Sequence, residues 1–308
     1  MTDDSSKDIR ITINQRKNTR LAWLFSAPAL LLLFVFLAVP FLMAIGLSFT
    51  DQRLVPNPNV PTRFVGLRNY VRLLEDDAFR RGLLNNFYFA IVVVPIQTGL
   101  ALFLALLVNQ KLKGVNLFRT IYFSPVVTTM VVVAIVWTFL YNPNGLINTF
   151  IQTISFGNLG PYDWLQNTKL VFPAIMVLSI WQGAGFQMVI FLAGLQDIPD
   201  YLYEAAEVDG ATKMQQFFHV TLPMLRNTTI FVVISTTILA FKLFTQVEVM
   251  TGGGPQNASM TTVVYMVRQG WGNLRVGYAS AISIVFFLIV LGVSLLQRRF
   301  LQERREVG

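Results

Sequence analysis

The sequence predicts an all-α membrane protein with six transmembrane helices. Of its 308 residues, 54% are hydrophobic and only 13% are charged, and the mean hydropathy is +0.56. Soluble domains average about 45–50% apolar and about 25% charged residues, so this composition disfavours a water-soluble globule, a disordered chain and a collagen-like fibre. Six separate stretches also contain the roughly 20 mainly apolar residues that a helix needs to cross a bilayer.

The six spans are expected at residues 21–47, 87–108, 121–141, 170–195, 230–250 and 276–296. Three of these stretches contain an internal proline, which a water-soluble helix seldom tolerates: Pro95, Pro125 and Pro173. Inside a bundle of membrane helices, neighbouring groups can satisfy the backbone atoms that such a proline frees. The first stretch exceeds the apolar run of about 7 to 15 residues in a secretory signal, so we interpret it as a retained span.

Basic residues set the predicted orientation of the spans. A majority of the 24 Lys and Arg fall in residues 1–20 and 298–308 and in the loops on the same side as these two tails. Loops rich in Lys and Arg stay in the cytoplasm, so both termini are expected there, and the six-span domain covers residues 21–297. The net charge of +8 and the pI near 9.9 then reflect loops that face an anionic leaflet, and we expect no nucleic-acid partner.

Two segments on the predicted outer side are long and polar. Residues 51–86 alternate apolar and charged positions at helical spacing after a proline-rich start, which predicts a helix along the outer surface. Residues 142–169 are rich in Asn, Gly and Pro, which predicts a loop. Neither segment could hold a core of its own, so we expect no separate soluble domain.

The loop between the fourth and fifth spans, residues 197–226, is predicted to form a cytoplasmic hairpin of two short helices. Asp197 can cap the first helix, and Pro199 suits its opening turn. After Asp209, the glycine at position 210 accepts the left-handed conformation that ends a helix. The hairpin therefore has a defined turn.

The second helix of the hairpin has its own start and stop signals. Thr212 followed by Gln215 predicts a capping box, and Leu222-Pro223 is expected to end the helix before the fifth span. The small side chains of Ala205 and Ala206 would let another protein approach the first helix closely. An apolar ridge beside them is expected from Leu202, Val208, Phe217 and Phe218.

These residues resemble a known family. The run Glu204-Ala205-Ala206, with Gly210 six residues after the glutamate and Leu222-Pro223 further on, is similar to the EAA loop of permease subunits of binding-protein-dependent ABC importers. Further matches are FVGLRNY at residues 64–70, Ser124-Pro125, and TGGGP at residues 251–255. The resemblance extends from about residue 20 onward and is greatest to the carbohydrate-uptake branch, of the maltose-permease and glycerol-3-phosphate-permease type.

The resemblance implies a type I ABC importer bundle whose hairpin sits in a cleft of an ATPase subunit and couples ATP use to transport. The residues implied in this coupling are Glu204, Ala205, Ala206, Asp209, Gly210, Ala211, Leu222 and Pro223. The implied partners are a homologous second permease, two ATPase subunits and an extracytoplasmic solute-binding protein. A homodimer of permeases remains open, and the location is the inner membrane of a prokaryote.

The chain lacks the residues of an enzyme site. ATP hydrolysis requires a loop of the form G-x-x-x-x-G-K-[ST], and the sequence contains no Gly-Lys dipeptide. With one histidine and no cysteine, we expect neither a metal site nor a nucleophile-and-base pair. We therefore expect a non-catalytic subunit without a cofactor of its own, with ATP and Mg bound by the partner ATPase.

The solute path is implied on the two spans that flank the hairpin. Matching by distance from Glu204, the resemblance gives Gln182, Gly183, Phe186, Thr236, Leu239, Ala240 and Leu243, and Lys242 is added as a cation within a span. Thr236, Ala240 and Leu243 are expected to share one helix stripe. Aromatic rings beside amides and hydroxyls suit a sugar.

Three alternative functions can be compared with the sequence. Lys242 leaves room for an anionic solute such as glycerol-3-phosphate or a glycerophosphodiester. An ion-gradient-driven secondary transporter would need buried carboxylates, and only Glu248 lies near a span. A purely structural membrane scaffold would not explain the patterned hairpin.

Overall fold

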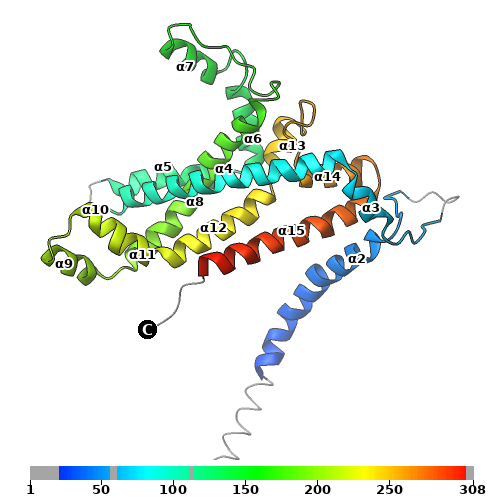
Figure 1. The fold of residues 1–308 in the computed structure, drawn as a ribbon, viewed down its shortest axis with the longest axis horizontal. Coiled ribbons are helices and arrows are strands. Elements are labelled where there is room, and N and C mark those ends of the chain that lie inside the picture. Colours follow the sequence, from blue (N-terminus) through cyan, green and yellow to red (C-terminus); the bar gives the residue numbers. More distant parts are fainter. Residues whose placement is uncertain (1–20, 56–60, 111–113, 303–308) are drawn as a thin grey trace, which may run out of the picture.

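A computed structural model describes residues 21–55, 61–110 and 114–302, and within these ranges it contains helices but no strand (Figure 1). One isolated antiparallel bridge joins Thr50 to Phe64. The fold class predicted from the sequence is therefore confirmed as all-helical. The predicted boundaries of the two tails lie mostly outside the described residues, although the last helix runs on to Gln302.

Five helices in the described ranges are long and apolar enough to cross a membrane, and a sixth candidate is a bent pair. The five are Leu21–Ser48, which includes the π-helical turn η1 (Phe34–Ala38) and α2 (Val39–Ser48); α4 (Asp77–Val108); α8 (Val171–Gln196); the broken span of α12 (Arg226–Phe241) and α13 (Thr245–Met250); and α15 (Val276–Gln302). The bent pair is α5 (Val115–Val127) and α6 (Met130–Leu140).

Shorter helices lie at the two ends of the bundle and in its connections. They are α3 (Arg68–Leu74), α7 (Leu146–Ile154), α9 (Asp200–Val208), α10 (Lys213–Gln216), η2 (Phe217–Thr221), α11 (Leu222–Met224), α14 (Thr262–Val267) and η3 (Arg268–Gly272). Figure 1 shows α9, α10 and α11 together at one end, which we call the hairpin end, and α3 and α14 at the opposite end.

The bundle is built on α4, which packs along α8 and α12, while α15 covers α12 and meets α2 near the opposite end. Two apolar clusters fill it. The larger one includes Ile175 and Phe241 and lies toward the opposite end, and the smaller one, with Phe191 and Leu225, lies toward the hairpin. The helix Leu21–Ser48 diverges from the bundle in Figure 1, and its most apolar stretch is unburied within this chain.

The third span, expected at residues 121–141 with Pro125 inside it, is a bent pair in which α5 and α6 meet at an angle of 97°. Pro125 lies in the last turn of α5 and cannot donate a hydrogen bond to the carbonyl of Ile121. The hydroxyl of Ser124 donates to that carbonyl instead, at 2.9 Å. Thr128 then adopts an extended conformation, which ends the helix.

Other predicted boundaries also shift. The expected surface helix in residues 51–86 is divided, since α3 is short and α4 already begins at Asp77. The expected loop 142–169 contains α7, whose apolar side chains Leu146, Phe150 and Ile154 recur at helical spacing. Pro173 is not internal to its span, because it lies in the first turn of α8, where no hydrogen bond is lost.

The break between α12 and α13 is held by buried polar side chains. Asn86 of α4 donates to the carbonyl of Phe241 at 2.9 Å and accepts the N–H of Thr262 at 2.9 Å. The hydroxyl of Thr261 donates to the carbonyl of Leu243 at 2.8 Å. These bonds satisfy backbone groups that the interrupted helix would leave unpaired in an apolar surrounding.

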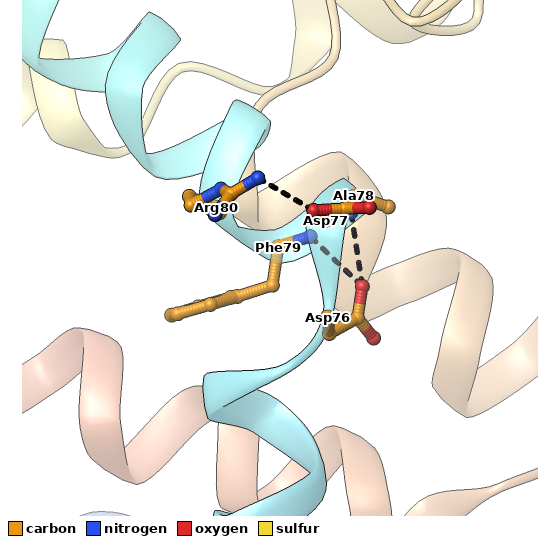
Figure 2. A network of polar contacts seen from close by, with 5 residues as sticks. All are labelled: Asp76, Asp77, Ala78, Phe79 and Arg80. Atoms are coloured by element: carbon orange, nitrogen blue, oxygen red, sulfur yellow. Dashed lines mark hydrogen bonds and ion pairs between the residues drawn. The ribbon is translucent and has the colours of Figure 1, made fainter.

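A second polar network fixes the start of α4. The Asp76 carboxylate accepts the N–H groups of Ala78 and Phe79, at 3.0 and 3.1 Å, and so caps the helix (Figure 2). It also accepts the hydroxyls of Tyr265 at 2.6 Å and Tyr278 at 2.5 Å, which come from α14 and α15. Burial opposes ionisation of Asp76, but these hydrogen bonds outweigh it and hold its pKa below the ordinary value.

Candidate functional site

The turn of the hairpin is a helix stop built on Gly210. Gly210 has φ +76°, the left-handed conformation that the sequence predicts at the end of α9. Glycine adopts this conformation readily because it has no side chain. The N–H of Ala211 donates to the carbonyl of Ala206 at 2.9 Å, and the N–H of Gly210 donates to that of Glu207 at 3.0 Å. This pair of bonds is a Schellman motif, and it fixes the direction in which the chain leaves α9.

The return arm begins with the predicted capping box, in which Thr212 and Gln215 satisfy each other's backbone N–H groups. One other expectation for the hairpin ends is wrong, because Asp197 caps the end of α8, and α9 starts only at Asp200 after Pro199. The second arm ends close to Leu222-Pro223, since α11 stops at Met224 and α12 begins at Arg226.

The predicted coupling residues lie together at the hairpin end, mostly on its surface. Glu204, Ala205, Asp209, Gly210, Leu222 and Pro223 are exposed, and Ala206 and Ala211 are half-buried. A hollow of about 260 Å³ between the arms is lined by Ala206, Asp209, Gly210 and Ala211 from this set, together with Gln215, Gln216, His219 and Val220. The tip therefore offers both a protruding helix and a recess to a partner.

The predicted apolar ridge of the hairpin is only half present. Val208 is 89% exposed and Phe218 is 53% exposed, whereas Leu202 and Phe217 are half-buried. Leu202 packs against the smaller apolar cluster, which seats α9 on the bundle. Exposed Tyr201, Met214 and Leu222 take part in the apolar surface instead.

An exposed ion pair links the two arms. Lys213 of α10 lies 2.5 Å from Glu207 of α9. The hydrogen bond from Lys213, the further contact with Gln216 and the lysine charge lower the pKa of Glu207 below its ordinary value. Because both side chains are in solvent, the ion pair contributes little to the free energy of unfolding.

A cavity of about 210 Å³ opens near the middle of α8 and α12. Its polar lining consists of the amides of Gln97, Gln182 and Gln187 and the hydroxyls of Ser235 and Thr236. Its apolar lining consists of Val126, Gly183, Phe186, Ile190, Val232 and Leu239. Amides and hydroxyls next to an aromatic ring can bind a polyhydroxylated ring, whose C–H face packs on the aromatic side chain.

The deepest polar group of this cavity is the Gln187 amide, which is 3% exposed. Its Nε2 donates to the hydroxyl of Thr236 on α12, and that hydroxyl donates to the carbonyl of Val232 at 2.6 Å. The Oε1 of Gln187 is buried and accepts no hydrogen bond from the described part of the chain. A buried acceptor without a partner is costly, so this oxygen is suited to receive a ligand hydroxyl or water.

Gly183 controls the width of this cavity. A Cβ at this position would lie 2.4 Å from the Nε2 of Gln97, so the glycine lets the amide of α4 lie against α8. Two residues further on, a Cβ at Gly185 would lie 2.1 Å from the carbonyl oxygen of Tyr122. Gly183 thus shapes the cavity, while Gly185 allows α5 and α8 to touch.

The structure brings five of the eight predicted path residues together: Gln182, Gly183, Phe186, Thr236 and Leu239 all line the cavity. Ala240 and Leu243 are 5% and 3% exposed and belong to the larger apolar cluster. Leu243 also lies beyond the end of α12, so the expected stripe with Thr236 does not form. Lys242 ends α12 as an exposed residue and does not line the cavity.

The predicted solute path does not include Gln97, Gln187 and Ser235, which also line the cavity; Gln187 and Ser235 are polar residues within the expected spans, whereas Gln97 was missed. Gln187 is buried on the face of α8 that turns toward Thr236, one helical turn beyond Gly183. Amides inside apolar spans are a usable signal, because a polar group in a membrane helix needs a partner. Gln97 is likewise an amide inside an apolar span, α4. Its contact with α8, however, depends on how the two helices pack, and a local sequence pattern does not predict that packing.

Comparison with known proteins gives a consistent result. Residues 78–306 match the family described as "Binding-protein-dependent transport system inner membrane component". A probable ABC transporter permease protein of Bacillus subtilis (strain 168), YurN, is 36% identical over 298 residues, which are 96% of this chain and 99% of that protein. The arabinooligosaccharides transport system permease protein AraP of the same strain is 34% identical, over 89% of this chain and 86% of that protein.

A further relative is named for a phosphorylated solute, and one solved structure has the same fold. The sn-glycerol-3-phosphate transport system permease protein UgpA of Yersinia enterocolitica is 32% identical, over 87% of this chain and 90% of that protein. The chain also superposes on a bacterial alginate ABC transporter solved with an alginate pentasaccharide-bound periplasmic protein. The TM-score is 0.82 at 22% identity, covering 96% of this chain and 98% of that one.

Proposed function

Since this chain belongs to the family of binding-protein-dependent transport system inner membrane components, we propose that it forms half of the translocation path of an ABC importer for a sugar or related polyol. The supporting observation is that the hairpin and the amide-lined cavity share the same two helices. The last turns of α8 lead directly into the hairpin, and α12 leaves it. Both helices also line the cavity.

The hairpin is the contact with the ATPase. About nine residues of α8 separate Gln187 from its end, or roughly 14 Å at 1.5 Å per residue. A displacement of the hairpin by a closing pair of ATPase subunits is thus transmitted along rigid helices to the cavity. The exposed Glu204 and Ala205 and the fixed turn at Gly210 form the contact surface.

The remaining subunits follow from this role. Two ATPase chains, which bind ATP and Mg, need two hairpins, so a second permease completes the path, and we assign a heterodimer over a homodimer. An extracytoplasmic solute-binding protein delivers the solute. Both termini and the hairpin face the cytoplasm in this arrangement, and α3 and α14 face outward.

A neutral sugar fits the cavity better than an anionic solute does. The lining has three amides, two hydroxyls and one phenyl ring, and it contains no cation. Lys242, the residue that would favour a phosphorylated solute, does not line the cavity. The glycerophosphate relative keeps the anionic solute as the second candidate, and AraP supports the saccharide.

An ion-gradient-driven transporter has no support in the described part of the chain. No Asp or Glu there is buried, whereas coupling to an ion needs carboxylates inside the membrane. Glu248 of α13 is exposed.

The test is purification of the chain together with its co-expressed neighbours, followed by identification of the bound subunits and of the solute that stimulates ATP hydrolysis. We expect two ATPase chains, a second permease and stimulation by a neutral saccharide with its binding protein. Uptake by the lone chain in a proton or sodium gradient would overturn the importer. Stimulation only by a glycerophosphate would overturn the substrate class alone.

A further inference from the structure

Another cavity, of about 350 Å³, lies at the opposite end, and none of its lining residues lines the cavity between α8 and α12. Three separate segments meet around it: residues 51–53 after α2, residues 61–72 around α3, and the start of α15. Four arginines line it, namely Arg53, Arg68, Arg72 and Arg275. Asp51 is the one acidic residue among the described lining residues.

The backbone around this cavity is tightly built. The N–H of Asp51 donates to the carbonyl of Arg63 at 3.1 Å, and the N–H of Leu54 donates to that of Leu274 at 2.9 Å. A Cβ at Gly277 would lie 2.1 Å from the carbonyl oxygen of Thr50, so only glycine lets the two segments lie this close. The arginines are thus carried on a fixed frame.

Asp51 can offset one of the four arginine charges, so the described lining keeps an excess of positive charge. None of the four guanidinium groups has a carboxylate within 4.0 Å in the described ranges, where the ion pairs are Arg80–Asp77 and Lys213–Glu207. Arg72 instead stacks on the ring of Tyr278, with its Cζ 4.8 Å from the centroid. The Oδ1 of Asp51 already accepts the N–H of Arg63 at 2.6 Å. Several guanidinium groups around one space fit the oxygens of a phosphate.

The position of the cavity relative to the spans indicates the source of that phosphate. Asp51 follows the end of the Leu21–Ser48 helix by three residues, and Arg275 directly precedes α15. The cavity therefore lies where two candidate spans end, which is the level of lipid headgroups. Further along the same two helices, Leu42 and Leu288 are exposed apolar side chains.

We propose that this arginine-lined cavity binds the phosphate headgroup of an anionic phospholipid. The arginines hold the phosphate oxygens, and the acyl chains run along the exposed apolar side chains of α2 and α15. This inference needs only the membrane location of the chain and is independent of the transported solute. A tightly held lipid here would tie the first span to α15, since their ends lie on either side of the headgroup.

The test uses the purified transporter complex in nanodiscs of mixed phosphatidylglycerol and phosphatidylcholine, with native mass spectrometry to count retained lipids. The variant is Arg53→Gln with Arg275→Gln. The control is Arg63→Gln with Arg80→Gln, which also removes two positive charges at this end, from residues that do not line the cavity. We expect wild type and control to retain phosphatidylglycerol in preference to phosphatidylcholine, and the double variant to lose this preference about tenfold.

Each other outcome overturns the proposal. Equal retention in all three proteins means that no lipid site exists here. Displacement by millimolar inorganic phosphate, without preference between the two lipids, indicates a site for a free oxyanion. Unchanged lipid retention combined with weaker docking of the binding protein indicates that the arginines meet acidic side chains of that protein. If the double variant does not assemble, Arg53→Gln and Arg275→Gln are measured separately; each should weaken the preference for phosphatidylglycerol, and an unchanged preference in both would overturn the proposal.

Discussion

The two ends of the bundle are held by different kinds of contact. At the opposite end, Asp76 and Asn86 bind three or more segments through hydrogen bonds to buried partners. At the hairpin end, the two arms are joined by local caps, an exposed ion pair and a hydrogen bond between the hydroxyls of Tyr203 and Thr221 at 2.9 Å, and Arg226 at the start of α12 donates to the carbonyl of Leu301 at 2.8 Å. The comparison indicates that one end is a fixed frame, whereas the hairpin is a rigid unit that can move on it.

The largest effect is expected from Asn86→Leu. This change leaves the carbonyl of Phe241 and the N–H of Thr262 without partners in a buried position, at a cost of about 3 kcal/mol. The melting temperature of the purified complex in detergent should fall by several degrees. Asn227→Leu, at an exposed position on α12, is the control and should change it little. Equal melting of both variants would show that the frame does not depend on Asn86.

A smaller loss of stability is expected from Asp76→Asn, which keeps the cap but removes the charge that two tyrosine hydroxyls bind. The loss should be about 1 to 2 kcal/mol at pH 7. The neighbouring Asp77→Asn breaks only the exposed pair with Arg80 and serves as the matched control (Figure 2).

A comparison of the wild type with Asp76→Asn also gives a pH test. The folded-state pKa of Asp76 is lowered, so its contribution is complete above the unfolded pKa of about 4 and is lost as the pH falls through the folded value. The difference in melting temperature between wild type and Asp76→Asn should be constant from pH 7 to about pH 5 and shrink below about pH 4. A difference that grows on acidification would contradict the network.

Gly210→Val should affect stability by only about 1 to 2 kcal/mol, because it strains one left-handed residue in an exposed turn. Gly210→Asn is the control, since asparagine tolerates this conformation. The melting temperature should be highest for the wild type, lower for Gly210→Asn and lowest for Gly210→Val. A loss as large as that of Asn86→Leu would mean that the hairpin belongs to the frame.

Lys213→Met is expected to have the smallest effect. It removes the pair with Glu207, and both side chains are in solvent. We expect no measurable change in melting temperature at any salt concentration. A clear decrease would show that the arms of the hairpin depend on this pair for their stability.

The sequence predicted those parts of the fold that depend on local pattern. The lengths of the apolar stretches predicted the positions of most of the spans. Gly210 and the capping box of Thr212 and Gln215 predicted the turn of the hairpin, because helix stops and caps depend on a few adjacent residues. The bend after Pro125 was not predictable in the same way. Pro95 stands in a similar apolar stretch, yet α4 continues through it because α8 and α12 pack along it.

The candidate cavity shows the same limit. Its residues on α8 and α12 lie at set distances from the hairpin, so five of them could be selected from the sequence. Gln97 and Val126 come from α4 and α5, whose positions depend on the close approach allowed by Gly183 and Gly185. The prediction is wrong for Ala240 and Leu243, because no local residue pattern predicts that α12 ends at Phe241.

The central claim is that hairpin and cavity act together through α8 and α12, and solute uptake per ATP hydrolysed in proteoliposomes tests it most directly. Gly210→Val should lower this ratio at least tenfold with the ATPase still bound, and Gln187→Leu should reduce uptake at the cavity. Gln297→Leu is the control, because it removes a similar amide bond to Thr237 on another face of α12. Normal uptake per ATP in both test variants, or an equal loss in the control, would contradict the account.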